Sequence, residues 1–147
     1  MIEPMTLNSI YVLDALIYGV VINAMTQSAT IYMEIDPEFH AGIPILTASP
    51  PEGPRIVDFI FSGATRATVS RMPRRNAAWK DDEKPHDYEI SDLRVQKLTL
   101  GNGYRLRVRC HLGQRIEIVF DSVDVRLSDR SPGATHQYER AHEERHV

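Results

Sequence analysis

The sequence predicts a mainly β protein, an antiparallel sandwich or open β-roll of about seven to eight strands with at most one short N-terminal helix. Three observations lead to this prediction. Hydrophobic residues recur with a period of two in several segments, short polar or glycine-containing stretches separate these segments, and no stretch has the pattern of a long amphipathic helix. We expect residues 1–130 to form a single β-rich domain and residues 131–147 to form a polar, flexible tail.

A short helix and a β-hairpin are expected at the start of the chain. Residues 6–16 fit a short helix with Thr6 or Asn8 as its N-terminal cap. Residues 15–23 are hydrophobic on both faces and rich in β-branched side chains, which is typical of a central strand. Residues 29–36 alternate between hydrophobic and polar side chains, as a half-buried strand does. The polar connection between these two segments is short, so we expect them to pair as a hairpin.

The middle of the chain is expected to contain one long loop, one or two strands and a second loop. Residues 37–54 contain five prolines, which excludes a helix or a central strand in this segment. Residues 55–63 are expected to form the next strand. The chain then continues this strand, or pairs back on it, after a kink at Ser62-Gly63. Residues 72–89 are polar and rich in charge, which predicts a surface loop.

The last third of the chain predicts a meander of three or four antiparallel strands over residues 93–127. Asn102-Gly103 is a strong signal for a tight reversal between two of them. Alternate residues should share a face, with an inward set (Tyr104, Leu106, Val108, Cys110) continued by Ile116, Ile118 and Phe120, and an outward set (Arg105, Arg107, Arg109, His111). The inward position of the single cysteine predicts a packed, unreactive thiol.

The charge is unevenly distributed along the chain. The formal net charge is −3, yet residues 1–54 hold six acidic side chains and no Lys or Arg. This asymmetry predicts a locally acidic surface that attracts a basic partner and repels nucleic acid. The stripe of Arg105, Arg107 and Arg109 is either ion-paired or a binding surface. No aromatic residues interleave with it, so we favour ion pairs with Glu117 and with acidic residues of neighbouring strands such as Asp92 or Asp124.

The C-terminal tail contains the pattern H-E-x-x-H, in which His142 and His146 could bind zinc while Glu143 activates a water molecule. Such a site needs a helix held against a core and a third ligand. Residues 131–147 offer no apolar stripe for a buried helix, and no ligand follows the motif in the sequence. We therefore expect no zinc site in the tail.

A second candidate metal site follows the second expected strand. Glu34, Asp36, Glu38 and His40 recur at every second residue, so on a continued strand they would share one face. Oxygen-rich ligands of this kind suit Mg²⁺, Mn²⁺ or Ca²⁺. Pro37 interrupts the strand, however, so we expect no metal here and no cofactor in the protein.

The residues expected to bind a partner are all acidic or aromatic. Asp36 and Glu38 belong to the acidic first third of the chain, while Trp79 would act as an aromatic anchor with Asp81 and Asp82 beside it. The sequence contains no Ser-His-Asp pattern, nucleophile elbow or phosphate-binding glycine loop, so no catalytic residue is assigned.

The order of the segments LDALIYGVVI, ATIYMEI, FIFSGATRATV, RRNAAW, YEISDLRV and YRLRVRCHLGQRIEIVFDSVDV resembles small β-rich immunity proteins of bacterial polymorphic toxin systems, over residues 11–127. That family combines an aspartate in its first strand, here Asp14, with later Phe-x-x-Val strands and an asparagine in a connecting loop. Leu13 stands where the family has a histidine. The resemblance implies a non-catalytic, cytoplasmic protein that blocks one toxin by covering it.

Together these observations predict a non-catalytic protein-binding module, in the form of an immunity protein that neutralises a cognate toxin by occlusion. Two alternatives remain: a metal-dependent hydrolase that uses either metal motif, and a structural or assembly subunit. We expect a basic protein partner, no nucleic acid and no membrane, with homodimerisation through a sheet edge as a further option. A single cysteine and the lack of a basic leader before the apolar residues 10–25 predict a cytoplasmic protein.

Overall fold

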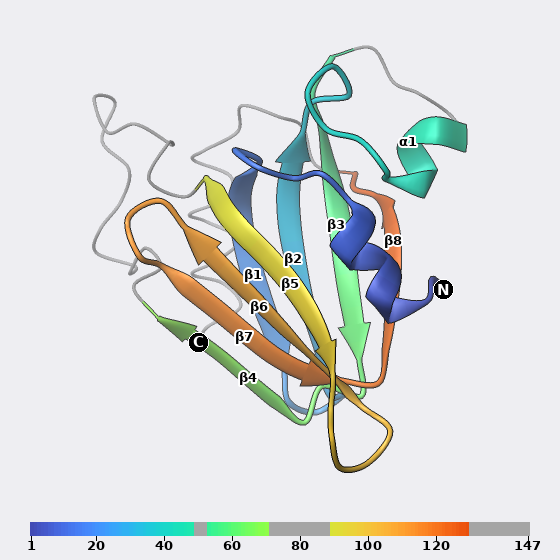
Figure 1. Ribbon diagram of the computed structural model, residues 1–147, viewed down its shortest axis with the longest axis vertical. Coiled ribbons are helices and arrows are strands. Elements are labelled where there is room, and N and C mark those ends of the chain that lie inside the picture. The colour runs from blue at the N-terminus through green and yellow to red at the C-terminus, as the bar shows by residue number, and fades with distance from the viewer. Residues whose placement is uncertain (49–52, 71–88, 130–147) are drawn as a thin grey trace.

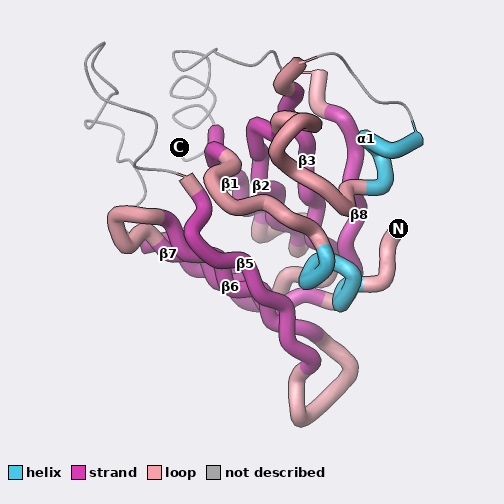
Figure 2. Tube along the Cα trace, turned by 45° about the horizontal axis from the view of Figure 1, so that its top comes forward, coloured by secondary structure: helices cyan, strands magenta, loops and turns pink. Residues whose placement is uncertain are grey.

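The computed structural model describes residues 1–48, 53–70 and 89–129, in which eight strands form two antiparallel sheets (Figures 1 and 2). The strand order is β1-β2-β3-β8 in the first sheet and β4-β7-β6-β5 in the second. The strands span Leu16–Asn23 (β1), Ser28–Ile35 (β2), Arg55–Ser62 (β3), Arg66–Ser70 (β4), Ile90–Lys97 (β5), Tyr104–Cys110 (β6), Arg115–Phe120 (β7) and Ser122–Leu127 (β8). The mainly β, antiparallel architecture expected from the sequence is confirmed.

A bent two-stranded ribbon belongs to both sheets. β3 pairs with β8 in the first sheet, and the chain continues from β3 into β4, which pairs with β7 in the second. Across the bend, the Asp121 amide donates to the Ser62 carbonyl at 2.9 Å and the Thr65 amide donates to the Val119 carbonyl at 3.0 Å. Gly63 has a φ of 64°, a left-handed conformation that glycine adopts readily. The expected kink is therefore confirmed, and it transfers the chain from one sheet to the other.

One hydrophobic core lies between the two sheets. Its buried residues come from both, including Ile17, Ile31, Met33, Phe59 and Phe61 from the first sheet and Val95, Leu106, Val108, Ile116, Ile118 and Phe120 from the second. The Phe61 and Phe120 rings meet edge to face, with their centroids 4.8 Å apart. Cys110 is buried in this core, and burial raises the pKa of its thiol to about 12. The thiol is thus protonated near neutral pH, as an unreactive packed cysteine should be.

Two strands are placed differently from the sequence-based expectation. β1 lies at the edge of its sheet and not in its centre. Its outer face is nevertheless buried, because Leu16 and Tyr18 belong to a second hydrophobic cluster with Tyr32 and Ile56. The hydrophobic residues on both faces of β1 correctly predicted that both faces are buried. This pattern does not show whether a strand has neighbouring strands on one side or on both. The fourth strand of the expected meander, β8, leaves its neighbours at Asp121 and joins the first sheet.

The two helical segments are short. A 3-10 helix, η1, spans Pro4–Ser9, and its cap is Glu3, whose carboxylate accepts the Met5 amide at 2.9 Å. Asn8, one of the two expected caps, instead bonds to the backbone of Val95 in β5 at 2.7 and 2.8 Å. A one-turn helix, α1 (Pro44–Ala48), forms within the loop that was expected to contain no helix. Its first residue is Pro44, at a position where a helix needs no amide donor.

Three segments are joined at the upper end of the molecule in Figure 1, where β1 and β5 begin and β2 ends. The Asp14 amide donates to the Ile90 carbonyl at 2.8 Å, and the Ile90 amide donates to the Ala15 carbonyl at 2.9 Å. Tyr11 forms an isolated bridge with Ala41 in the loop after β2. These bonds hold the residues before β1 between the start of β5 and the loop after β2. In the described ranges, no helix is long and apolar enough to cross a membrane.

Candidate functional site: an acidic pocket

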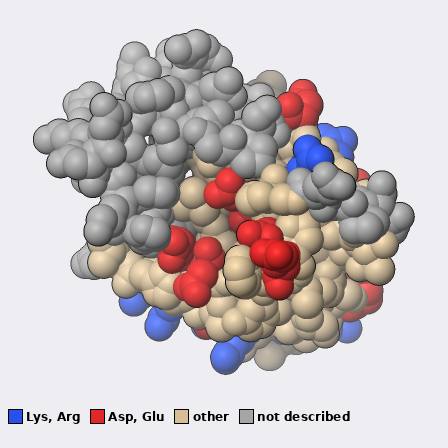
Figure 3. Space-filling view, turned by 90° about the horizontal axis from the view of Figure 1, so that it is seen from above, with Lys and Arg blue, Asp and Glu red and all other residues tan. Residues whose placement is uncertain are grey.

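A pocket of about 520 Å³ opens at this end of the molecule. Four acidic side chains line it: Asp14, Glu34, Asp36 and Glu89. Aromatic side chains line it as well, including Tyr11 and Phe39, while the described lining residues include no Lys or Arg. Seen from above in Figure 3, Asp and Glu side chains gather on this end of the molecule. The pocket is therefore a concave surface of strongly negative character.

The turn after β2 shapes one wall of the pocket. The Asp36 carboxylate accepts the Glu38 amide at 3.0 Å, and the Asp36 carbonyl accepts the amides of Phe39 at 3.0 Å and His40 at 2.9 Å. This tight turn ends β2 and leaves the Glu38 carboxylate in solvent. It also leaves the Phe39 ring 67% exposed. Asp36 and Glu38, both expected to contact a partner, thus lie at the pocket and beside it, with Asp36 also holding the turn together.

His40 has a structural role in the same wall. It is buried, its Nδ1 accepts the Asp36 amide at 2.9 Å, and its Nε2 lies 3.0 Å from the Leu13 carbonyl. An amide can only donate and a carbonyl can only accept, so the neutral ring carries its proton on Nε2. Both ring nitrogens are used by the backbone. The structure therefore does not bring Glu34, Asp36, Glu38 and His40 together as one ligand set, because the turn at Pro37 breaks the alternation that would align them.

Glu34 is the pocket acid with the most perturbed environment. Burial raises the pKa of its carboxyl above the ordinary value of 4.5, and the neighbouring Asp36 charge raises it further. A hydrogen bond from Tyr18 opposes these two effects in part. Ionisation of Glu34 is therefore disfavoured in the folded protein, and a cation entering the pocket would favour it.

The variant Glu34→Gln should change how stability depends on pH. The folded-state pKa of Glu34 lies above its unfolded value, so the folded protein loses stability as pH rises through that folded-state pKa. Glutamine cannot ionise, and the variant should gain stability relative to the unchanged protein as pH rises above 4.5, with the smallest difference below that value. Urea unfolding of both proteins at several pH values below and above 4.5 measures the difference in their free energies of unfolding. Parallel stability profiles would contradict the expected environment of Glu34.

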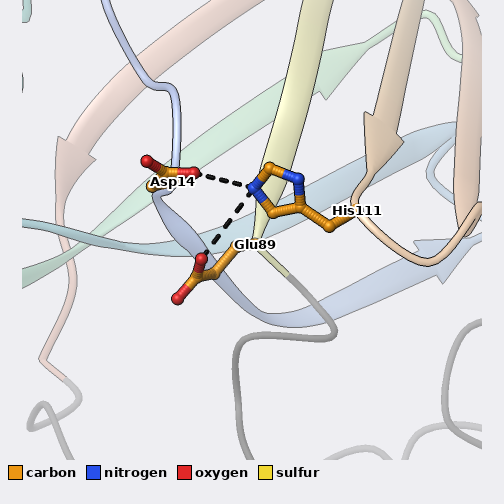
Figure 4. A group of neighbouring side chains, drawn as sticks. All are labelled: Asp14, Glu89 and His111. Carbon is orange, nitrogen blue, oxygen red and sulfur yellow. Dashed lines mark hydrogen bonds and ion pairs between the residues drawn. The ribbon is translucent and has the colours of Figure 1, made fainter.

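Three side chains from distant parts of the sequence meet beside the pocket (Figure 4), and two of them, Asp14 and Glu89, also line it. His111 Nε2 lies 2.7 Å from an Asp14 carboxylate oxygen and 3.9 Å from a Glu89 carboxylate oxygen. One donor atom from each residue lies within 4.8 Å of the others, so the group could hold a divalent cation. The hydrogen bond between His111 and Asp14 also explains the cluster without an ion. It joins the start of β1 to the turn after β6 and reinforces the contact between the two sheets.

Two sets of sequence-predicted site residues lie outside the described part of the chain. They are the proposed anchor Trp79 with Asp81 and Asp82, and the terminal motif residues His142, Glu143 and His146. The site also contains residues that the sequence did not single out, namely Tyr11, Phe39 and Glu89. Phe39 could have been selected from the sequence, because it is an aromatic residue directly beside the acidic Glu38. No spacing relates Asp14 to His111, which are 97 residues apart.

Comparisons with known proteins identify no family for this chain. No protein-family model matches it, and no curated protein sequence matches it significantly. Among solved structures, it is similar to the crystal structure of an uncharacterized protein from Neisseria gonorrhoeae, with a TM-score of 0.47 and 8% sequence identity. The similarity covers 79% of this chain and 93% of that chain.

Proposed function

We propose that the protein is a non-catalytic binding module whose acidic pocket receives a basic segment of a partner protein. The observation that supports this most is the composition of the pocket, which is lined by four carboxylates and by no Lys or Arg among the described residues. A lysine or arginine side chain from a partner would enter a site of opposite charge. Complementary charge of this kind accelerates association and disfavours partners of the wrong sign.

The environment of Glu34 supports a cationic ligand in particular. Burial and the Asp36 charge both disfavour its ionised form. A bound ammonium or guanidinium group would offset both effects and favour the carboxylate. The exposed rings of Phe39 and Tyr11, which are 67% and 51% exposed, offer apolar contacts at the same opening. Aromatic residues flanked by charges are typical anchors of protein interfaces.

Within this function we favour the role implied by the family resemblance, an immunity protein that neutralises a toxin by covering it. We also propose a cytoplasmic location, which agrees with the single, buried cysteine of this sequence. The hydrolase alternative has less support, because the two nitrogens of His40 are used by the backbone.

Hydrogen–deuterium exchange of the complex tests where the partner binds. Affinity capture with the full chain, from cells that encode it, supplies the partner. Binding should slow exchange of the backbone amides in residues 10–16 and 36–42, which surround the pocket. Amides of β8, on the far edge of the first sheet, serve as the internal control and should be unaffected. If only β8 or the outer face of the second sheet gains protection, the pocket is not the binding site.

A further inference from the structure

The outer face of the second sheet is strongly basic. Inward residues of β6 and β7 are buried in the core, so the alternate residues, and those paired with them on β4 and β5, face away from it. This outer face carries six arginines (Arg66, Arg94, Arg105, Arg107, Arg109 and Arg115) and two acidic residues (Asp92 and Glu117). In Figure 3, Lys and Arg side chains lie along the lower margin, below the acidic side chains in the centre, and others lie at the upper right.

The ion pairs expected for this arginine stripe form only in part. Glu117 contacts Arg105 at 3.3 Å and Arg107 at 4.0 Å, as the sequence suggested. Asp124, however, lies in the other sheet and pairs with the N-terminal amine at 3.7 Å. Within the described ranges, no carboxylate forms an ion pair with Arg94, Arg109 or Arg115. The sheet therefore has more cationic side chains than its own acids neutralise.

Two cross-strand pairs on this face bring like charges together. Arg94 of β5 is directly opposite Arg107 of β6, and Arg109 of β6 is directly opposite Arg115 of β7. Like charges at directly opposed positions destabilise a sheet. Packing of the inward residues does not require arginine at these outward positions. A bound polyanion would offset the repulsion.

We propose that this face binds the sugar–phosphate backbone of a nucleic acid without reading its base sequence. Arginine binds phosphate through two parallel hydrogen bonds, and all six cations of the face are arginines. Successive outward arginines of β6 are separated by about 6.8 Å, which gives a regular row of cations. Among the described residues, this face has none of the aromatic side chains that would stack on bases or form the centre of a protein interface, so an acidic protein fits it less well.

The basic outer face of the second sheet is a separate surface from the acidic pocket, so this binding is additional to the proposed function. The expectation that nucleic acid would be repelled came from the negative net charge and from the acidic first third of the chain. The structure separates the two charges: the acids gather at one end of the sandwich, and the arginines lie on the outer face of one sheet. In physiological salt, charges are screened beyond about 8 Å, so electrostatic attraction depends on this local distribution.

Fluorescence anisotropy with a labelled single strand and a labelled duplex of mixed sequence tests the proposal. The full chain should bind at least one of them at about 50 mM salt, and the logarithm of its binding constant should fall with a slope of about −3 to −4 against the logarithm of salt concentration, as expected for about four phosphate contacts. The double variant Arg94→Gln/Arg109→Gln should bind about tenfold more weakly at this salt concentration, and its slope should be smaller by about 2.

A matched variant and a stability measurement make the result specific. Arg55→Gln/Arg126→Gln removes the same number of charges from exposed positions on β3 and β8 of the first sheet and should leave the affinity nearly unchanged. The melting temperature of Arg94→Gln/Arg109→Gln should stay the same or rise, because two like-charge pairs are removed. The proposal is overturned if neither nucleic acid binds, if the two double variants lose affinity equally, or if poly-glutamate competes as well as nucleic acid of the same charge.

Discussion

Replacing Phe120 with alanine is expected to lower the free energy of unfolding by about 3 to 5 kcal/mol. Phe120 is fully buried at the end of β7, where the chain leaves the second sheet. Its ring centroid lies 4.8 Å from that of Phe61 in the first sheet and 5.8 Å from that of Tyr104 in the second. The substitution therefore opens a cavity at the contact between the sheets, and the surrounding backbone is held by ladders on both sides of the bend.

Guanidinium unfolding of the variant and of two controls measures this effect. Phe120→Leu keeps most of the buried volume and should lose less stability than Phe120→Ala, which provides a folded comparison if the alanine variant does not fold. Leu100→Ala removes a side chain that is 87% exposed and should change stability by less than about 0.5 kcal/mol. A loss of less than about 1 kcal/mol in Phe120→Ala would mean that the two sheets do not share one core.

The elements that the sequence predicted well are those defined by local alternation. The hairpin of β1 and β2, and the division of β6 into a buried and an exposed face, follow from residues that are neighbours in the chain. The sheet that each strand joins does not follow from residues that are neighbours in the chain. The chain changes sheets at Gly63 and again at Asp121, and the period of two is the same on either side of each change. A local pattern therefore could not show that β8 pairs with β3.

The pocket was predictable only in part for the same reason. Asp36 and Glu38 were selected because acids are concentrated early in the chain, and the structure places both at or beside the pocket. Glu89 reaches it because the start of β5 is bonded to residues 14 and 15, a contact across more than half of the chain. The spacing of His40 fits a metal ligand. The turn at Pro37 instead places its Nε2 against the Leu13 carbonyl.

If the acidic pocket attracts a basic partner, the rate of association should depend on the charges around it. The double variant Asp36→Asn/Glu38→Lys makes this region less negative, while the asparagine introduced at position 36 retains a side-chain oxygen that can accept the amide of residue 38. Its association rate constant with the captured partner should fall by about ten- to a hundredfold at low salt, and the salt dependence of that rate should flatten. Asp92→Asn/Asp129→Lys makes the same change in net charge at exposed positions that do not line the pocket.

Stopped-flow association at several salt concentrations, with both double variants and the unchanged chain, is the decisive measurement. We expect slow, weakly salt-dependent association for Asp36→Asn/Glu38→Lys, and nearly unchanged association for Asp92→Asn/Asp129→Lys. Equal association rates for both variants, with the salt dependence of the unchanged chain retained, would show that the pocket does not attract the partner.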